Sequence, residues 1–328
     1  MLNWAITGTS FISTVMADRI RKSPGSRCAS VFGRDGGKVQ EFADSYAIGT
    51  ATTDLGSILE DPSIDVVYVG LPNHLHRQVA EQALIRGKAV VCEKSLTVDL
   101  DDAIQLASTV NRTHGFFMEG YAYLHHPLIH LLIGALTSGK IGRLKSIQAS
   151  YAADIAKFAN PLGGGTIFNL GCYPISIIHL IFKAAYSRDG FERAKVFGTA
   201  NCSSEGLVLD AAALIQFERG LTASVYSSDS YGLRADLSIH GEIGTIVFNT
   251  NPWLPGAGHS SFEIRYHDGR SENFETKSDL DCFGHQIKYV EQCVNAGNPR
   301  PSWPAPTIDN SLEVMKILST WQSACTAS

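Results

Sequence analysis

The chain has 328 residues, and because a domain commonly holds roughly 100–200 residues, this length accommodates two domains. Its 27 basic and 32 acidic residues give a formal net charge of −5, which argues against a nucleic-acid-binding surface. Charged residues make up 18% and hydrophobic residues 44% of the chain, as is typical of a folded globular protein and not of a disordered one.

The seven cysteines are an odd number without a Cys-x-x-Cys pair, which indicates reduced intracellular thiols. The N-terminal segment lacks the basic and apolar regions of a secretory signal. The apolar runs are far shorter than the ~18 residues that a bilayer-crossing helix needs. We therefore expect a cytoplasmic protein with no membrane partner. We also expect no metal site, because no His-Glu-x-x-His motif or cysteine cluster accompanies the histidines.

Short apolar runs alternate with helical patterns over the first 120 or so residues, which predicts a parallel sheet built from β-α-β units. Five of these runs are expected to be strands: 3–7, 28–32, 64–70, 88–92 and 116–119. Helices are expected at 75–86 and at 100–110, where Asp99 is a candidate N-cap. Residues 1–121 are thus predicted to form a doubly wound Rossmann domain that binds a dinucleotide.

From about residue 143, strand-like runs follow one another with turns between them, which indicates a mostly antiparallel sheet. Strands are expected at 144–152, 194–202, 207–217, 221–228, 236–240, 245–249 and 262–266, and helices at 173–182, 284–295 and 308–321. Residues 122–328 are therefore predicted to form an α+β domain, which makes the whole chain α/β. We expect the last helix, 308–323, to pack back on the first domain, after a rigid proline-rich connector at 299–306.

One face of this second sheet is expected to stay open. Alternation places Leu207, Leu209, Ala211 and Ala213 on one side of a strand. An apolar face of this kind is costly to leave in water, so we predict a homodimer or homotetramer.

The first candidate motif is Gly-Thr-Ser-Phe-Ile-Ser at residues 8–13, directly after the first strand. Small residues at such a turn let backbone N–H groups and a helix N-terminus approach a pyrophosphate. Ser10 and Ser13 replace the second and third glycines of Gly-x-Gly-x-x-Gly. A plain strand-to-helix turn is therefore an equally good interpretation of this motif alone.

The end of the second predicted strand bears on the choice of cofactor. Arg34 comes first, Asp35 follows it, and Lys38 lies one turn later. An acidic residue at this strand end binds the ribose hydroxyls of NAD, whereas an arginine accommodates the 2′-phosphate of NADP. We expect NADP(H), with NAD(H) as the alternative because of Asp35. A solvated arginine without a ligand is the structural alternative.

Two loops follow the carboxyl ends of buried strands, where open parallel sheets bind ligands. The loop Leu-Pro-Asn-His-Leu-His at 71–76 is a candidate for cofactor contact, with polar residues at a helix start as the alternative. The loop Cys-Glu-Lys-Ser at 92–95 places Lys94 beside a buried strand end. A lysine in that position either faces solvent or takes part in chemistry, where it can donate a proton or a hydrogen bond to a carbonyl oxygen.

Gly163, Gly164 and Gly165 form a three-glycine loop that runs into a predicted helix. Such glycines permit positive φ angles and a close approach of the backbone. The helix would carry Asn169, Tyr173 and Ser176 on one face at i, i+4 and i+7. The alternative is a simple turn with Tyr173 in the core.

The order and spacing of these motifs, with Met-Glu-Gly-Tyr-Ala-Tyr-Leu-His-His-Pro at 118–127 among them, closely resemble the glucose-fructose oxidoreductase, inositol dehydrogenase and rhizopine-catabolism (MocA) family of NAD(P)-dependent oxidoreductases. The resemblance covers residues 3–180 at the level of motifs and the remainder in architecture. It implies a dehydrogenase or reductase acting on CH–OH groups, in which residues 122–328 bind the substrate and present an open sheet that forms oligomer contacts.

The resemblance also implies roles for individual residues. Lys94 matches the active-site lysine of the family's Glu-Lys-Pro motif, and Tyr173 matches a tyrosine of the branch that includes dihydrodiol dehydrogenase, xylose dehydrogenase and nucleotide-sugar 3-ketoreductases. Together with the positions above, it predicts cofactor contacts at Gly8, Thr9, Ser10, Phe11, Ile12, Arg34, Lys38, Leu71, Pro72, Asn73, His76, Glu93 and Lys94. Substrate contacts are predicted at Asn169, Glu119, His125 and His126, with structural capping as the alternative for the two histidines.

Two positions depart from the family pattern. Ser95 replaces the proline that usually follows the lysine, which suggests a looser loop around Lys94. Asn169 stands where many members have an aspartate, and it cannot act as a general base. We therefore expect Lys94 and Tyr173 to stabilise and protonate the substrate oxygen, with Asn169 orienting the substrate.

Three functions follow as hypotheses. The first is NADP(H)-dependent hydride transfer to or from a secondary alcohol or ketone of a sugar-like substrate: a free sugar, a nucleotide sugar or a cyclitol. The second is a catalytically silent NADP-binding regulatory protein. The third is an enzyme that uses tightly bound NAD(P) transiently.

Overall fold

The computed structural model describes residues 1–158, 160–186 and 190–326 of the chain. These residues form two compact units. The first comprises Met1–His125 and Phe283–Leu312, and the second comprises His126–Cys282 and the described residues from Glu313 onward. Helix α10 (Ile308–Thr326) therefore contributes its first residues to one unit and the others to the second.

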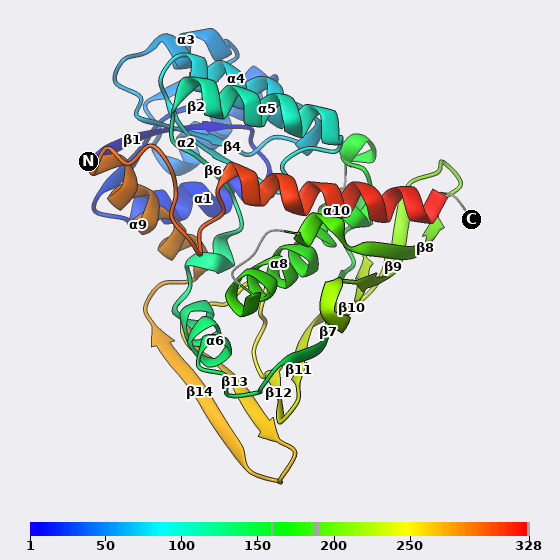
Figure 1. Cartoon of the computed structure of the whole chain (residues 1–328). Coiled ribbons are helices and arrows are strands. Elements are labelled where there is room, and N and C mark those ends of the chain that lie inside the picture. The colour runs from blue at the N-terminus through cyan, green and yellow to red at the C-terminus, as the bar shows by residue number, and fades with distance from the viewer. Residues whose placement is uncertain (159, 187–189, 327–328) are drawn as a thin grey trace. The chain divides into compact units, whose positions relative to one another are not determined.

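The first unit is built on a parallel sheet with the strand order β3-β2-β1-β4-β5-β6 (Figure 1). Its strands are β1 (Leu2–Thr7), β2 (Ser26–Phe32), β3 (Thr50–Thr52), β4 (Val66–Val69), β5 (Ala89–Cys92) and β6 (Phe117–Glu119). The strand order reverses between β1 and β4, the place where doubly wound sheets bind ligands. The predicted Rossmann architecture is thereby confirmed.

Helices flank this sheet, and polar side chains mark their starts. The helical segments are α1 (Phe11–Lys22), α2 (Gly36–Tyr46), α3 (Leu55–Glu60), η1 (Asn73–Leu75), α4 (His76–Ile85), α5 (Leu100–Thr113), η2 (Ala122–His125) and α9 (Cys282–Asn295). Asp99 caps α5 as predicted, accepting hydrogen bonds from two backbone N–H groups. Ile287 and Val290 of α9 join the core around Trp4 and Ile6, so a late segment of the chain completes the first unit.

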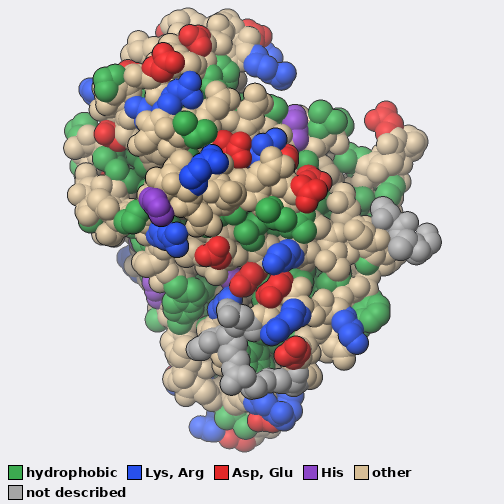
Figure 2. All heavy atoms as spheres, turned by 45° about the horizontal axis from the view of Figure 1, so that its top comes forward, with side chains coloured by type: hydrophobic (Ala, Val, Ile, Leu, Met, Phe, Trp, Pro, Cys, Tyr) green, Lys and Arg blue, Asp and Glu red, His purple; other side chains and the backbone are tan. Residues whose placement is uncertain are grey.

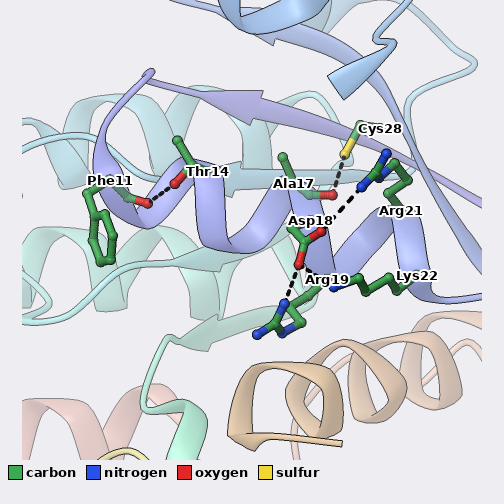
Figure 3. A network of polar contacts seen from close by, with 8 residues as sticks. All are labelled: Phe11, Thr14, Ala17, Asp18, Arg19, Arg21, Lys22 and Cys28. Carbon is green, nitrogen blue, oxygen red and sulfur yellow. Dashed lines mark hydrogen bonds and ion pairs between the residues drawn. The ribbon is translucent and has the colours of Figure 1, made fainter. Parts of the chain in front are cut away.

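Helix α1 ends in a cluster of charge around Asp18 (Figure 3). The carboxylate of Asp18 pairs with Arg19, with Arg21 at 3.4 Å and with Lys22 at 2.8 Å. The hydrogen bond from Lys22 is the main cause that lowers the pKa of Asp18. Basic side chains in a last helical turn also interact favourably with the helix dipole.

The second unit contains an eight-stranded sheet with the order β14-β13-β12-β11-β7-β10-β9-β8. Its strands are β7 (Leu144–Ala153), β8 (Lys195–Cys202), β9 (Val208–Gln216), β10 (Thr222–Ser228), β11 (Leu233–Gly241), β12 (Gly244–Phe248), β13 (Gly258–Tyr266) and β14 (Ser271–Ser278). Neighbouring strands are antiparallel except β7 and β10, which are parallel. The prediction of a mostly antiparallel sheet is confirmed.

Helices cover one face of this sheet. They are α6 (Pro127–Thr137), α7 (Thr166–Asn169), α8 (Cys172–Tyr186) and the part of α10 that belongs to this unit, with short turns η3 (Ala156–Phe158), η4 (Pro161–Gly163), η5 (Phe191–Arg193) and η6 (Glu218–Gly220) between elements. Helix α7 packs on β9 and β10, and α8 packs on β7 and β10.

The sequence prediction of which apolar face stays open is wrong. Ala211 and Ala213 are buried, at 2% and 6% exposure, because they share the helix-covered side with Ile215. The opposite side of the same strands presents Leu214 and its cross-strand neighbour Phe197, which are 51% and 59% exposed. Alternation separates the two faces correctly but does not say which one the helices cover.

Two strands escaped prediction because they carry little apolar character. β3 is only three residues long, and β14 has Phe274 as its single large apolar residue. Within the described ranges, none of the helices combines the length and the apolarity needed to span a bilayer. On the face shown in Figure 2, acidic and basic side chains are interspersed, in keeping with a net charge of −5.

Candidate functional site

The turn after β1 leaves no room for a side chain at residue 8. Gly8 has a φ of +97°, and a Cβ on it would lie 2.8 Å from the carbonyl oxygen of Gly70, at the end of β4. Ser10 caps α1, accepting the N–H of Ser13 at 3.4 Å and donating to the Gly70 oxygen at 3.1 Å. Thr9 and Ile12 are half-buried beside this turn, and Phe11 is 82% exposed. The ends of β1 and β4 thus meet at the reversal of strand order, as a dinucleotide turn requires.

The end of β2 lies against the same turn. The backbone N–H of Gly8 donates to the Phe32 oxygen at 2.7 Å, and a Cβ on Gly33 would lie 2.6 Å from Val39. Arg34 and Lys38 are exposed here. Asp35 caps α2, and its carboxylate accepts the backbone N–H of Lys38 at 3.1 Å. The carboxylate of Asp35, which was the reason to consider NAD, is therefore hydrogen-bonded to the start of α2. The side chains of Arg34 and Lys38 remain exposed.

The loop after β4 and the loop after β5 are joined by hydrogen bonds. Asn73 donates from its side-chain amide to the Ser95 hydroxyl at 3.4 Å. The imidazole of His76 reaches the Leu71 carbonyl on one side and the Ser95 and Leu96 carbonyls on the other. The structure thus brings together the predicted cofactor residues Leu71, Pro72, Asn73 and His76 and the predicted lysine loop.

Lys94 is the one partly exposed residue in the buried stretch 91–97. On one side of it, Glu93 is buried and accepts the hydroxyl hydrogen of Tyr68 at 2.7 Å, and burial is the main cause that raises the pKa of this carboxyl. On the other side, Ser95 is fully buried and donates its hydroxyl to the Thr97 oxygen at 2.9 Å. Both the hydroxyl group and the carbonyl group of Ser95 thus lie within hydrogen-bonding distance of a partner.

Glu119 ends β6 as a buried carboxyl group, 1% exposed. Within the described part of the chain, no hydrogen bond of normal geometry reaches either of its oxygens. Burial raises the pKa of Glu119 to about 8, against the smaller opposing effects of Ser311, Tyr121 and the Leu96 backbone. The group is therefore a neutral acid at neutral pH.

The two neighbouring histidines make different contacts within the protein. The ring of His125 packs on Tyr289 with 4.7 Å between ring centroids. His126 is fully buried and caps α6, accepting the backbone N–H of Leu128 on Nδ1 at 3.2 Å. Capping was the alternative interpretation of the sequence for His126, and the structure confirms that His126 caps α6.

The three-glycine loop leads into two helices instead of the single predicted helix. Helix α7 ends at Asn169 and α8 begins at Cys172, so Asn169 does not share a helix with Tyr173 and Ser176. The break lies at Gly171, where a Cβ would come within 2.7 Å of the Ile167 oxygen and 2.9 Å of the Trp321 ring. Because Trp321 comes from α10, this constraint is invisible in the local sequence.

Asp229, at the end of β10, is a residue that sequence reasoning missed. It is 1% exposed and accepts the side-chain amide of Asn169 at 3.0 Å. Tyr173 follows Asn169 in the sequence, and its ring makes an edge contact with the ring of Tyr151, with 5.2 Å between the ring centroids. An aspartate directly after a predicted strand, in a run of serines, was the available signal. Lys94 belongs to the first unit, whereas Asn169, Tyr173 and Asp229 belong to the second.

Comparison with known proteins agrees with this division. A family model described as an oxidoreductase family with an NAD-binding Rossmann fold matches residues 2–121, and a GFO/IDH/MocA C-terminal domain model matches residues 131–247.

Two relatives are similar along most of their length. The trans-1,2-dihydrobenzene-1,2-diol dehydrogenase of Bos taurus is 24% identical over 90% of this chain and 89% of that protein. The D-xylose 1-dehydrogenase (NADP(+)) 2 of Haloferax volcanii is 24% identical over 96% of this chain and 94% of that protein. The crystal structure of KijD10, a 3-ketoreductase from Actinomadura kijaniata in complex with NADP and TDP-benzene, shares the fold, with a TM-score of 0.85 at 22% identity over 98% of this chain and 97% of that one.

Proposed function

Because the chain belongs to the glucose-fructose oxidoreductase, inositol dehydrogenase and MocA family of oxidoreductases with an NAD-binding Rossmann fold, we propose that it transfers a hydride between NADP(H) and a secondary alcohol or ketone of a sugar or sugar-like substrate. The observation that carries this proposal is the position of Lys94. It is the one partly exposed side chain in a buried stretch, on a loop tied to the loop of Asn73 at the carboxyl edge of the sheet.

The residues around the first strands fit a dinucleotide. Gly8 and Gly33 leave the space that a side chain would fill, and the N-terminus of α1 lies between them and the end of β4. Arg34 and Lys38 favour NADP because two exposed cations can bind a 2′-phosphate. Asp35 accepts the backbone N–H of Lys38 at the start of α2, which turns its carboxylate toward the helix.

When bound, the nicotinamide supplies or accepts the hydride. In the direction of reduction, negative charge grows on the substrate oxygen, and the ammonium group of Lys94 stabilises it. The phenol of Tyr173 donates a proton to the same oxygen and becomes a phenolate, and in the direction of oxidation this phenolate takes the proton back. Asn169 orients the substrate, with its amide plane fixed by the hydrogen bond to Asp229.

A cofactor-linked screen of the purified protein tests this function. Free sugars, nucleotide ketosugars, cyclitols and trans-dihydrodiols would be supplied with NADP⁺ or NADPH, and absorbance at 340 nm followed in both directions. The proposal predicts a net change with at least one secondary alcohol or ketone. NADPH binding without turnover of any compound would instead indicate a regulatory protein. Product formation without a net absorbance change would indicate transient use of the cofactor.

A further inference from the structure

His76 joins two loops through backbone carbonyl groups alone. The residue opens helix α4, and its side chain is 1% exposed. Its Nε2 lies 2.8 Å from the oxygen of Leu71, while its Nδ1 lies 3.0 Å from the oxygen of Ser95 and 3.2 Å from that of Leu96. Both ring nitrogens are therefore occupied within the protein, and the ring spans the distance between the loop after β4 and the loop after β5.

All three partners of the ring are acceptors, which limits how it can bind them. A neutral imidazole carries a single N–H, so each tautomer donates to one of the two loops. Burial lowers the pKa of His76 to about 4, against the smaller opposing effects of the Leu71, Ser95 and Leu96 carbonyls. At neutral pH the ring therefore donates one hydrogen bond, either to the Leu71 carbonyl or to the Ser95 and Leu96 carbonyls, and it packs against the carbonyl of the other loop.

The residues on either side of this link are those of the proposed site. The Leu71 carbonyl precedes Pro72 and Asn73, and the Ser95 carbonyl directly follows Lys94. Glu93 is anchored to Tyr68, and the Ser95 hydroxyl is anchored to Thr97, so the backbone around Lys94 is held on both sides. Among these anchors, His76 is the one that connects the lysine loop to the cofactor loop through both of its ring nitrogens.

We propose that His76 is a positioning residue, which sets the place of Lys94 relative to the cofactor loop by standing between the Leu71 and Ser95 carbonyls and donating a hydrogen bond to one of the two loops. The proposal rests on the proposed function in so far as Lys94 acts on the substrate. Misplacing a catalytic group by about 1 Å can cost roughly 100-fold in rate. A change at His76 should therefore reach turnover through the position of Lys94.

Two substitutions separate the two halves of the link. The amide nitrogen of asparagine takes the place of Nδ1, so His76→Asn keeps a donor for the Ser95 and Leu96 carbonyls and loses the one for Leu71. Glutamine reaches the place of Nε2, so His76→Gln keeps the donor for Leu71 and loses the other. His76→Leu retains apolar volume and removes both. His114→Asn is the matched control, because His114 is exposed at the end of α5 with a φ of 52° that asparagine tolerates.

The measurements are amide hydrogen exchange of the cofactor-free protein, NADPH affinity by fluorescence titration, and kcat. The neutral ring donates to one loop, so one of the two amide variants keeps the wild-type hydrogen bond and the other loses it. If Nδ1 carries the hydrogen, His76→Gln should raise exchange about tenfold in peptides covering 94–97 and lower kcat by roughly 10- to 100-fold, with NADPH affinity changed less than about threefold, and His76→Asn should resemble the wild type. If Nε2 carries it, His76→Asn should raise exchange in 71–75 and lower NADPH affinity by roughly 3- to 10-fold, with kcat changed less than about threefold, and His76→Gln should resemble the wild type. His76→Leu should show the effect of the variant that loses the hydrogen bond, and His114→Asn should show neither effect.

Two outcomes would overturn the proposal. One is that His76→Asn and His76→Gln change both peptides, affinity and kcat alike, in step with a common loss of thermal stability, as a purely structural residue would. The other is that neither variant differs from His114→Asn. Hydrogen exchange needs no substrate, so a split between the two peptides in a protein that turns over no sugar would contradict the proposed function and leave the link between the loops standing.

Discussion

The loop of Lys94 and the loop of Asn169 are held in place by different means. Side chains hold the first, through the hydrogen bonds of His76 and Ser95 to backbone carbonyl groups. Glycines shape the second, with positive φ at Gly164 and Gly165 and a helix break at Gly171 that permits contact with Trp321. The lysine loop therefore depends on side-chain hydrogen bonds, whereas the glycine loop depends on the absence of side chains.

The largest effect is expected at the second loop, from the removal of one hydroxyl. Tyr173→Phe keeps the ring on Tyr151 and removes the proposed proton donor, so turnover should fall by roughly 10²–10⁴-fold. Steady-state kinetics with the best substrate of the 340 nm screen, beside thermal melting, measure this. An unchanged kcat in a variant that melts normally would remove Tyr173 from the mechanism.

The next largest effect is expected on the stability of the protein, where the contribution of Glu119 in the first unit depends on pH. Burial raises the pKa of Glu119 to about 8, well above its ordinary value of 4.5. The folded protein therefore keeps a proton that the unfolded chain loses between these values, so this group's contribution to stability is complete below pH 4.5 and is lost as the pH rises toward 8.

Glu119→Gln removes this dependence, because glutamine stays neutral. Relative to the variant, the wild type should lose about 1.4 kcal/mol of unfolding free energy per pH unit over that range. Urea unfolding at pH 5, 6, 7 and 8 measures the difference. Parallel stability curves for the two proteins would show that Glu119 is ionised in the folded state.

A glycine of the second loop should come next in size. Gly165→Ala would drive a Cβ into the Val208 carbonyl at a φ of +73°, and it should destabilise the protein by about 2–4 kcal/mol. Gly206→Ala is the matched control, because Gly206 also has a positive φ but open space around it, and it should cost about 1 kcal/mol. Urea unfolding of both variants checks this, and equal losses would mean that the close approach at Gly165 does not constrain the loop.

The smallest effect concerns affinity for the cofactor. Arg34→Ala should weaken the binding of NADPH by roughly 10- to 100-fold, which corresponds to the loss of one charge-assisted hydrogen bond. The affinity for NADH should change less than about threefold. Fluorescence titration with each nucleotide measures the two constants. Equal weakening of both would assign Arg34 a structural role at the end of β2.

The central strands of the first unit could be predicted because the apolar side chains that bury them stand next to one another in the sequence. Ile6, Val67 and Val91 are fully buried, and each lies in a run of apolar residues. The motifs at the strand ends likewise carry their own signal, since the carboxyl edge of a parallel sheet is where its ligands bind.

The remaining features depend on partners far away in the chain. The helix break at Gly171 lies against Trp321 of α10, and the side chain of Asn169 is oriented by its hydrogen bond to Asp229. The covered side of β9 is decided by helix α7, which begins at Thr166, and not by the strand's own alternation. His76 stood among the predicted cofactor contacts, yet its link to Ser95 joins residues from two separate loops.

The most direct test of the account is Lys94→Met, with turnover and NADPH affinity measured on the same preparation. The account predicts that turnover falls by roughly 10²–10⁴-fold while the folded protein still binds NADPH. Lys195→Met, at an exposed lysine of β8, should retain the turnover of the wild type. A Lys94→Met protein that turns over substrate at the rate of Lys195→Met would contradict the account.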